Sequence, residues 1–198
     1  MNTRNIVIAS IIAAILLLGG CGCSGYNNMV SLDQNVKGSW SKVQSEYQRR
    51  SDLIPNLVST VRGAADFEKS TLEAVIGARA KATQTVIDPA NLNPENIAKF
   101  QQAQGELSGA LSRLLVTVEQ YPDLKANQNF RDLQTQLEGT ENRIKTARND
   151  FNESVQSYNT TIKKFPTVIF AGMFGFTEKG YFSADAGAEK APTVDFGK

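Results

Sequence analysis

Histidine is absent from this sequence of 198 residues, and cysteine occurs only twice, at Cys21 and Cys23. The lack of histidine removes the commonest general base and the commonest metal ligand, and with them every Ser–His or Cys–His catalytic pair. Because both cysteines lie beside the N-terminus, a disulfide framework or a four-ligand zinc site is excluded. We therefore predict a protein with no catalytic residue, no cofactor and no metal ion.

An excess of charge of one sign is also lacking. The net charge is +1, from 21 Lys and Arg residues against 20 Asp and Glu residues, so there is no electrostatic case for binding nucleic acid. The sequence shows no nucleophile motif and no glycine-rich phosphate loop, and no small-molecule substrate is evident. Strand patterns are nearly absent before Pro166. These deficits favour a helical protein that binds or supports another protein.

The N-terminal residues have the order of an export signal. Arg4 comes first, the uncharged apolar run Ile6–Leu18 follows, and small residues complete the segment. This order is typical of a signal peptide. Arg4 is expected to stay in the cytoplasm, while everything after Cys23 is exported. We therefore predict that residues 1–25 form a signal or membrane anchor at the bacterial membrane, with the rest of the chain periplasmic or extracytoplasmic.

The mode of anchoring has two interpretations. Residues 18–21, Leu-Gly-Gly-Cys, resemble the lipobox of bacterial lipoproteins, in which the cysteine is diacylated and becomes the new N-terminus; here it is Cys21. In the alternative, the segment is retained as a transmembrane helix. Ile6–Gly20 is shorter than the roughly 20 residues that a span needs, although the neutral stretch up to Val30 could extend it. We favour lipidation of Cys21 and keep the transmembrane helix as the alternative.

Four amphipathic helical patterns occur within residues 26–166, over about 32–61, 66–85, 94–121 and 127–165. The longest, Asn127–Phe165, repeats apolar residues every three or four positions with one gap at Thr140, which predicts a helix with one apolar stripe. At ~1.5 Å per residue it would be roughly 55–60 Å long, and it needs partner helices of similar length. We predict an all-α domain, an antiparallel up-and-down four-helix bundle with long helices, preceded by the membrane anchor.

Local signals add detail to this bundle. Pro55 falls inside the first pattern and should kink it near residues 51–54. Asn93 followed by Pro94 predicts an N-cap with proline at the first helical position. Trp40 belongs to the apolar face of the first pattern, and we expect it to be buried.

The composition changes after Pro166. Residues 167–182 are rich in aromatic residues and glycine, and we expect them to pack on the bundle. The alternative is a surface that contacts a partner or a membrane. Residues 183–198 are small and polar and predict a flexible tail.

A polar stripe borders the apolar stripe of the longest helix, and its members are Glu138, Glu141, Arg148, Asn152 and Asn159. Together with Arg79 and Glu119 we interpret it as a structural polar network or a binding seam. Glu141 and Arg148 would be neutralised there by opposite charges such as Arg79 and Glu119, which fixes the register of the helices. Further charged candidates are Arg49, Arg50 and Asp52.

The same stripe also admits a catalytic alternative. Glu138 and Glu141 lie one helical turn apart, and two carboxylates at this spacing could hold a metal ion or perform general acid–base chemistry. The second hypothesis is therefore a carboxylate-based or metal-dependent hydrolase that uses Glu138 and Glu141.

Several longer motifs carry a family resemblance: Tyr26-Asn27, Trp40, Arg49–Val58, Ala78-Arg79-Ala80, Glu119–Asn127, Phe130 with Leu133, Leu137–Asn142, Asn152, Tyr158-Asn159, Phe165-Pro166 and Tyr181-Phe182. In this order they resemble the LemA family over about residues 26–182. The resemblance implies a short cytoplasmic N-terminus, a membrane anchor and an exported domain that forms a four-helix bundle. It transfers no catalytic residue. Many family members have a plain membrane helix, so the lipobox-like setting of Cys21 is a departure.

These observations together predict a non-catalytic scaffold or binding module of the cell envelope. The N-terminal anchor would attach it to the membrane, and another envelope protein would be its partner.

The substitution Cys21→Ala tests the mode of anchoring. It should abolish acyl labelling of the protein and change its apparent size, because an acylated cysteine is the point at which the signal would be removed. Metabolic labelling with a fatty acid and gel electrophoresis measure both effects. If neither the size nor the label changes, the transmembrane helix is the correct interpretation.

Overall fold

The structure, a computed structural model, describes residues 3–63 and 67–184, and over much of residues 6–23 it describes the helix without the side chains. The helices are α1 (Thr3–Arg62), α2 (Lys69–Gln84), α3 (Pro94–Val118), α4 (Pro122–Lys125), α5 (Gln128–Lys163) and α6 (Thr167–Phe174). The described residues contain no strand. The all-α prediction is therefore confirmed.

α1 is one uninterrupted helix of 60 residues, which corresponds to about 90 Å. The domain boundary predicted at Tyr26 falls inside it. Pro55 also lies within α1 and, having no N–H, leaves the carbonyl of Ser51 without its helical partner. Arg79 of α2 supplies a replacement, because its Nε donates to this carbonyl at 2.9 Å. The helix therefore continues through the proline with its polar backbone satisfied.

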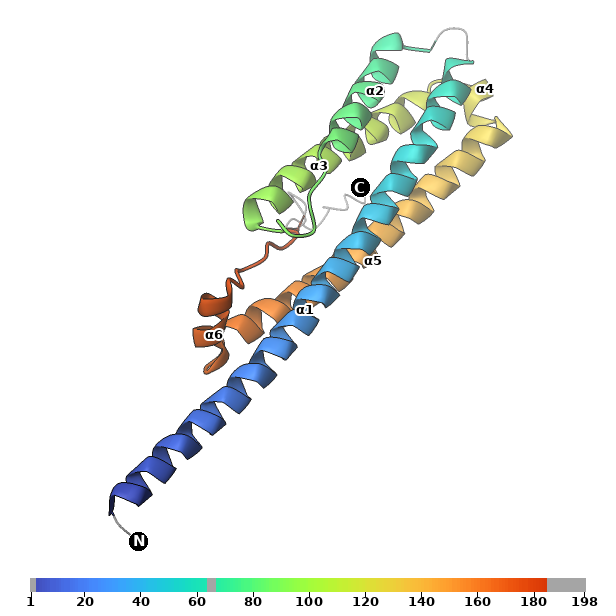
Figure 1. Cartoon of the computed structure of the whole chain (residues 1–198). Coiled ribbons are helices and arrows are strands. Elements are labelled where there is room, and N and C mark those ends of the chain that lie inside the picture. Colours follow the sequence, from blue (N-terminus) through green and yellow to red (C-terminus); the bar gives the residue numbers. More distant parts are fainter. Residues whose placement is uncertain (1–2, 64–66, 185–198) are drawn as a thin grey trace, which may run out of the picture.

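Figure 1 shows two antiparallel pairs of helices. α1 and α5 lie side by side along α5, and α2 and α3 form a second, shorter pair that packs near the C-terminal end of α1. The chain direction reverses from α1 to α2, from α2 to α3 and from α3 to α5. We expected the partner helices to be as long as α5, which has 36 residues. Only α1 meets this expectation, because α2 has 16 residues and α3 has 25.

The apolar core consists of two clusters. One surrounds Trp40, and the other surrounds Leu57 closer to the C-terminal end of α1. Trp40 is fully buried, as predicted, and its ring centre lies 5.1 Å from Phe100 and 5.4 Å from Phe151. Phe182, which follows α6 in the chain, completes this aromatic group at 5.5 Å from Phe151.

The capping signals explain where α3 and α5 begin. Asn93 accepts a hydrogen bond from the backbone N–H of Asn96 at 2.8 Å, and Pro94 is the first residue of α3, as predicted. Asn127 caps α5 in the same way. α5 ends at Lys163, so Phe165 lies beyond the helix and is 82% exposed. Its assignment to the end of the apolar stripe was wrong, because the helix stops before the stripe can include it.

The chain after α5 folds back on the molecule. α6 packs against α1 and α5, and the segment after it extends toward the start of α3 (Figure 1). Most of the predicted tail, residues 185–198, lies outside the described residues. Among the residues that the structure describes, no helix is both long enough and apolar enough to cross a membrane.

The substitution Phe182→Ala should lower the free energy of unfolding by about 3–5 kcal/mol, because it removes a buried ring from the aromatic group. The matched control is Phe165→Ala, whose exposed ring should contribute within about 0.5 kcal/mol. Denaturant unfolding of the detergent-solubilised full chain measures both. Equal losses for the two variants would contradict the central position of Phe182.

Candidate functional site

A layer of buried polar side chains separates the two apolar clusters, and its members are Arg50, Ser51, Gln104 and Thr140. Thr140 fills the gap in the apolar stripe of α5, and its hydroxyl donates to the carbonyl of Gln136 at 2.7 Å. α2 also reaches this level through the bond from Arg79 to Ser51. α1, α2, α3 and α5 therefore all meet at the polar layer.

Arg50 is the centre of the layer and is only 1% exposed. Its Nη1 donates to the hydroxyl of Ser108 at 2.7 Å and to the carboxylate of Glu141 at 2.6 Å. Its Nη2 donates to the side-chain oxygen of Gln104 at 2.7 Å. The guanidinium carbon lies 5.0 Å from the centre of the Tyr47 ring, which adds a cation–π contact. One side chain of α1 thus binds both α3 and α5.

Burying a guanidinium is unfavourable unless its charge is neutralised and its donors are bonded. Glu141 supplies the opposite charge while its own side chain stays 46% exposed, so the loss of solvation falls mainly on Arg50. The remaining partners come from α3. A shift of α3 or α5 by one turn would separate them from the guanidinium, and the layer therefore fixes the register of the helices.

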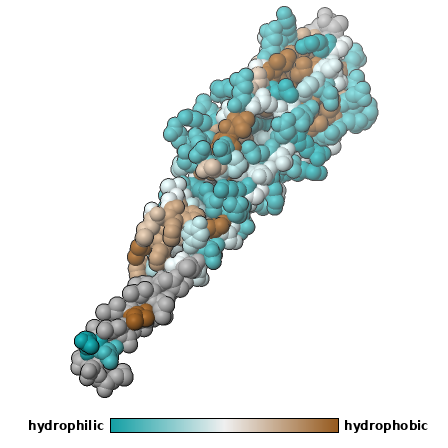
Figure 2. Space-filling model, viewed as in Figure 1, coloured by the Kyte–Doolittle hydropathy of each residue, from teal (hydrophilic) through white to brown (hydrophobic). Residues whose placement is uncertain are grey.

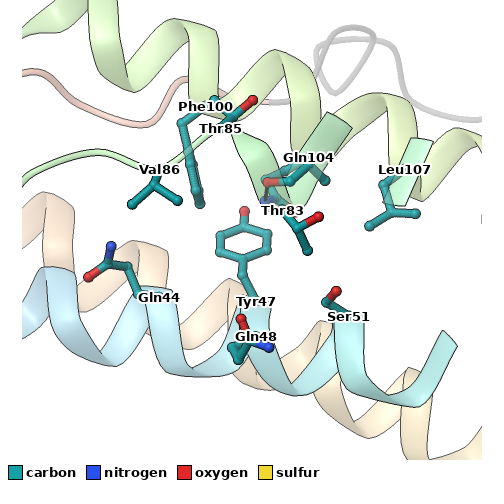
Figure 3. Close-up of a pocket in the computed structure, with 11 residues that line it drawn as sticks. Gln44, Tyr47, Gln48, Ser51, Thr83, Thr85, Val86, Phe100, Gln104 and Leu107 are labelled. Atoms are coloured by element: carbon teal, nitrogen blue, oxygen red, sulfur yellow. Dashed lines mark hydrogen bonds between the residues drawn. The ribbon is translucent and has the colours of Figure 1, made fainter. Parts of the chain in front are cut away.

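A small cavity lies beside the layer, between α1 and the pair α2–α3. Figure 3 shows Tyr47 reaching from α1 toward Phe100 and Gln104 of α3 across this cavity. Its volume is about 80 Å³, well below the ~300 Å³ at which ligand pockets begin. The cavity has room for water and is too small for a substrate.

A longer groove runs between α3 and α5. The part of about 700 Å³ is lined by α1, α3 and α5, whereas the adjoining part of about 630 Å³ is lined by α5 and residues 182–184. The two parts share Glu141, Ile144 and Arg148 of α5. The α3 side is lined by small residues, among them Gly105, Ser108, Gly109 and Ser112. A Cβ atom added to Gly105 or Gly109 would have no atom of another group within 4 Å, so this wall is open. Arg50 also contributes to the lining.

Asparagines of α5 hold the chain's own segment Lys179–Ser183 at one end of this groove, and they do so through its backbone. The Asn159 amide donates to the carbonyl of Lys179 at 2.9 Å and accepts from its N–H at 3.0 Å. Asn152 makes the same two bonds with Phe182, both at 2.9 Å. Each asparagine thus satisfies both backbone groups of one residue, as a neighbouring strand would.

α3 and Arg148 extend this clamp to Ser183. Gln101 of α3 donates to the Ser183 carbonyl and accepts from its N–H, both at 3.0 Å. Arg148 donates to the same carbonyl at 2.8 Å, and its guanidinium carbon lies 5.0 Å from the centre of the Phe182 ring. The extended segment therefore bridges α3 and α5.

Lys179 attaches the same segment to α1. Its ammonium lies 2.8 Å from the carboxylate of Asp33, which also pairs with Lys37 at 2.8 Å. Burial raises the pKa of Asp33, but the hydrogen bonds from Lys179 and Lys37 outweigh it and bring this pKa below its usual value. Burial, followed by the charge of Asp33, raises the pKa of Tyr158 to about 12. Near neutral pH Asp33 is therefore ionised and Tyr158 is protonated, and the ion pair with Asp33 attaches Lys179 to α1.

Comparison with protein families finds that residues 39–196 match the model of the LemA family. This range includes the polar layer, the clamped segment and both clusters of the core apart from Met29 and Val36. The chain belongs to the LemA family.

This LemA family chain is similar to several curated proteins. Magnetosome protein MamQ 2 of Paramagnetospirillum magneticum is 28% identical over 174 residues, 79% of this chain and 64% of the relative. Magnetosome protein MamQ of Magnetospirillum gryphiswaldense shows the same identity and coverage. Protein LemA of Metamycoplasma hominis is 27% identical over 144 residues, 72% of this chain and 62% of the relative. The chain spans slightly less than two thirds of the length of these relatives.

The polar stripe of this LemA family chain divides into two parts. Glu141 belongs to the Arg50 layer, whereas Arg148, Asn152 and Asn159 hold the extended segment. Glu141 pairs with Arg50 in place of the expected Arg79, which is needed at the carbonyl freed by Pro55.

The other expected partner, Glu119, also lies elsewhere. It forms an ion pair with Lys125 beyond the end of α3, because the short turn into α4 brings the two side chains together. Arg49 and Asp52, adjacent to the layer in sequence, are exposed.

Sequence reasoning named Arg50 among many charges but missed its central role. The available signal was its position within the series Val43, Tyr47, Ile54 and Leu57, whose spacing of three and four places residue 50 on the buried face. Gln104 gives the same signal between Phe100 and Leu107 of α3. Gln101 and Phe182 gave no such signal, because their contacts join distant parts of the chain.

The catalytic alternative gains no support from the geometry. Glu138 is exposed and accepts a hydrogen bond from Gln134 at 3.0 Å, while Glu141 is bound to Arg50. In the part of the chain that the structure describes, no three Cys, Asp or Glu residues come together as a metal site.

These two glutamates supply a matched test. Glu141→Ala should lower the free energy of unfolding by about 3 kcal/mol, near the lower end for breaking a buried ion pair, because it leaves the charge of Arg50 unpaired. Glu138→Ala, one turn away, should change it by less than about 0.5 kcal/mol. Thermal and denaturant unfolding of the full chain compare them. Similar stabilities of the two variants would contradict the structural role of Glu141.

Proposed function

We propose that this LemA family protein is a non-catalytic, membrane-anchored binding module of the bacterial cell envelope, with its domain outside the cytoplasm. It binds an extended segment of another envelope protein in the groove between α3 and α5. The observation that carries the proposal is the clamp of Asn152 and Asn159, which already holds an extended segment by its backbone.

The chemistry of the groove fits this role. Side-chain amides that bond both backbone groups of a residue bind an extended chain whatever its side chains are, as in recognition by strand addition. The adjoining part of the groove, beside Gly105 and Gly109, has space for more residues. Glu141 and Arg148 border it with opposite charges, which would select among the side chains of a partner.

The anchor and the domain act as one unit in this proposal. α1 runs without interruption from residue 3 to residue 62, so the groove is held at a fixed height above the membrane, on a bundle of α1, α2, α3 and α5. The apolar run Ile6–Leu18 is evidence for attachment in both modes. It is either the signal that precedes a lipidated Cys21 or part of a retained membrane helix. The MamQ relatives are named as magnetosome proteins, which agrees with an association with membranes.

Site-specific photo-crosslinking in intact cells tests the groove. A photoreactive amino acid in place of Gly109 should form a crosslink to one envelope protein, because a partner segment would lie against this wall of α3. Mass spectrometry of the crosslinked product identifies the partner. The substitution Gly105→Leu in the same chain should remove the crosslink by filling the groove.

The matched control is the same photoreactive amino acid in place of Gly77 on α2. Gly77 is also a helical glycine with open space around its Cβ position, but it lies outside the groove. Equal capture of the same protein from positions 77 and 109, or a crosslink that persists with Gly105→Leu, would refute binding in the groove.

A further inference from the structure

Large apolar side chains gather on the surface at α6. The exposed fractions are 82% for Phe165, 73% for Met173, 54% for Ile169, 53% for Phe174 and 46% for Val168. Figure 2 shows them as a pale-to-brown area beside α1 on an otherwise mostly hydrophilic surface. Single exposed apolar residues need no explanation, but a contiguous group of them indicates a contact surface.

This surface also lacks charge. No Asp, Glu, Lys or Arg occurs from Phe165 to Thr177. Charged residues border the stretch on both sides: Lys163 and Lys164 precede it, and Lys163 forms an ion pair with Glu178 at 2.7 Å. A face that water covers in the working protein would be expected to carry polar residues between these borders.

The position of α6 along α1 indicates what covers it. Phe170 packs on Gly22, where an added Cβ would lie 3.2 Å from the ring. The ring of Tyr26 lies 4.9 Å from Phe174 and 5.9 Å from Phe176. Gly22 and Tyr26 follow the apolar run Ile6–Leu18 closely along the same helix. α6 is therefore fixed at the level where α1 leaves its apolar N-terminal part.

We propose that α6 lies in the lipid interface and forms a second membrane contact beside the anchor. The inference rests on the membrane attachment proposed above and holds for both modes of anchoring. Acyl chains on Cys21 would start one residue from Gly22, and a retained membrane helix would emerge at the same level. The exposed apolar face would enter ~5–10 Å into the boundary between headgroups and acyl chains.

The flanking residues fit this placement. Tyr26, which packs on Phe174 and Phe176, is of a residue type that is enriched at membrane–water interfaces. Lys164 stands directly after α5 and next to α6, where anionic headgroups would attract it. With one contact at α1 and another at α6, the orientation of the long helices relative to the membrane would be fixed as well as their distance from it.

Fluorescence quenching by lipids tests the contact in the full chain. The variant Met173→Trp is reconstituted into vesicles of phosphatidylethanolamine and phosphatidylglycerol, with or without bromine on the acyl chains. The added indole should show a blue-shifted emission and lose most of its fluorescence to the brominated lipid. Ile169→Trp, on the same surface, provides a second reporter.

Two controls bracket this result. The wild-type chain reports only the buried Trp40, which lies about 27 Å along α1 from Gly22, and its emission should be unaffected by the brominated lipid. Val116→Trp places an indole at a side chain that is 69% exposed on α3 and should also be unquenched. Circular dichroism checks that every variant keeps its helices.

The outcomes separate this inference from the proposed function. If the chain floats with the vesicles but neither reporter is quenched, the contact of α6 with lipid is wrong and the anchor stands. Unquenched reporters together with crosslinks between copies would mean that a second copy covers α6, which also overturns the inference. A chain that does not float with vesicles would refute the anchor and the α6 contact with it.

Discussion

The buried guanidinium of Arg50 is the constraint on which the arrangement of the helices depends. Leucine and phenylalanine cores tolerate many registers, since apolar contacts are not directional. A guanidinium tolerates few registers, because its N–H groups point in fixed directions within one plane and each needs an acceptor. Gln104 and Ser108 from α3, together with Glu141 from α5, accept from the two Nη groups, while the buried Nε has no acceptor. α2 joins the polar layer through Arg79, whose Nε donates to the Ser51 carbonyl that Pro55 leaves without a helical partner. The two apolar clusters are thus aligned by the polar layer between them.

The segment Lys179–Ser183 has the complementary role at the other cluster. It contacts α1 through Asp33, α3 through Gln101 and α5 through two asparagines. Gly180 also donates to the carbonyl of Leu92, and an added Cβ there would lie 2.6 Å from Pro94. A side chain at this position would separate the segment from the loop before α3. Where α2 is too short to cover the pair α1–α5, an extended segment takes its place.

The sequence predicted the features that depend on near neighbours in the chain better than the contacts between residues that are far apart in it. The helices, the cap at Asn93 and the burial of Trp40 follow from periodicity and from neighbours within one turn, and these were predicted. The polar stripe on α5 was also recognised, but its partners were not. Asn152 and Asn159 bond a segment 20 to 30 residues away in sequence, and Arg50 meets Glu141 across 91 positions. Opposite charges in one sequence allow many pairings, and only the three-dimensional arrangement selects one. Pro55 was the sequence feature nearest to predicting a distant contact, because a proline in a helix leaves the carbonyl four residues earlier without its helical partner.

Phe182 follows all the helices of the described residues and yet occupies the middle of the aromatic group around Trp40. Without the residues that follow α6, the rings of Trp40, Phe100 and Phe151 would face an unfilled space, and the asparagines of α5 would have no backbone to hold. The packing of this cluster is therefore complete only when residue 182 is available. A domain generally folds as a unit once its residues are available, and here the residue that completes the packing arrives after the framework. A chain that ends before Phe182 would therefore lack both the ring that completes the aromatic group and the segment that bridges α3 and α5.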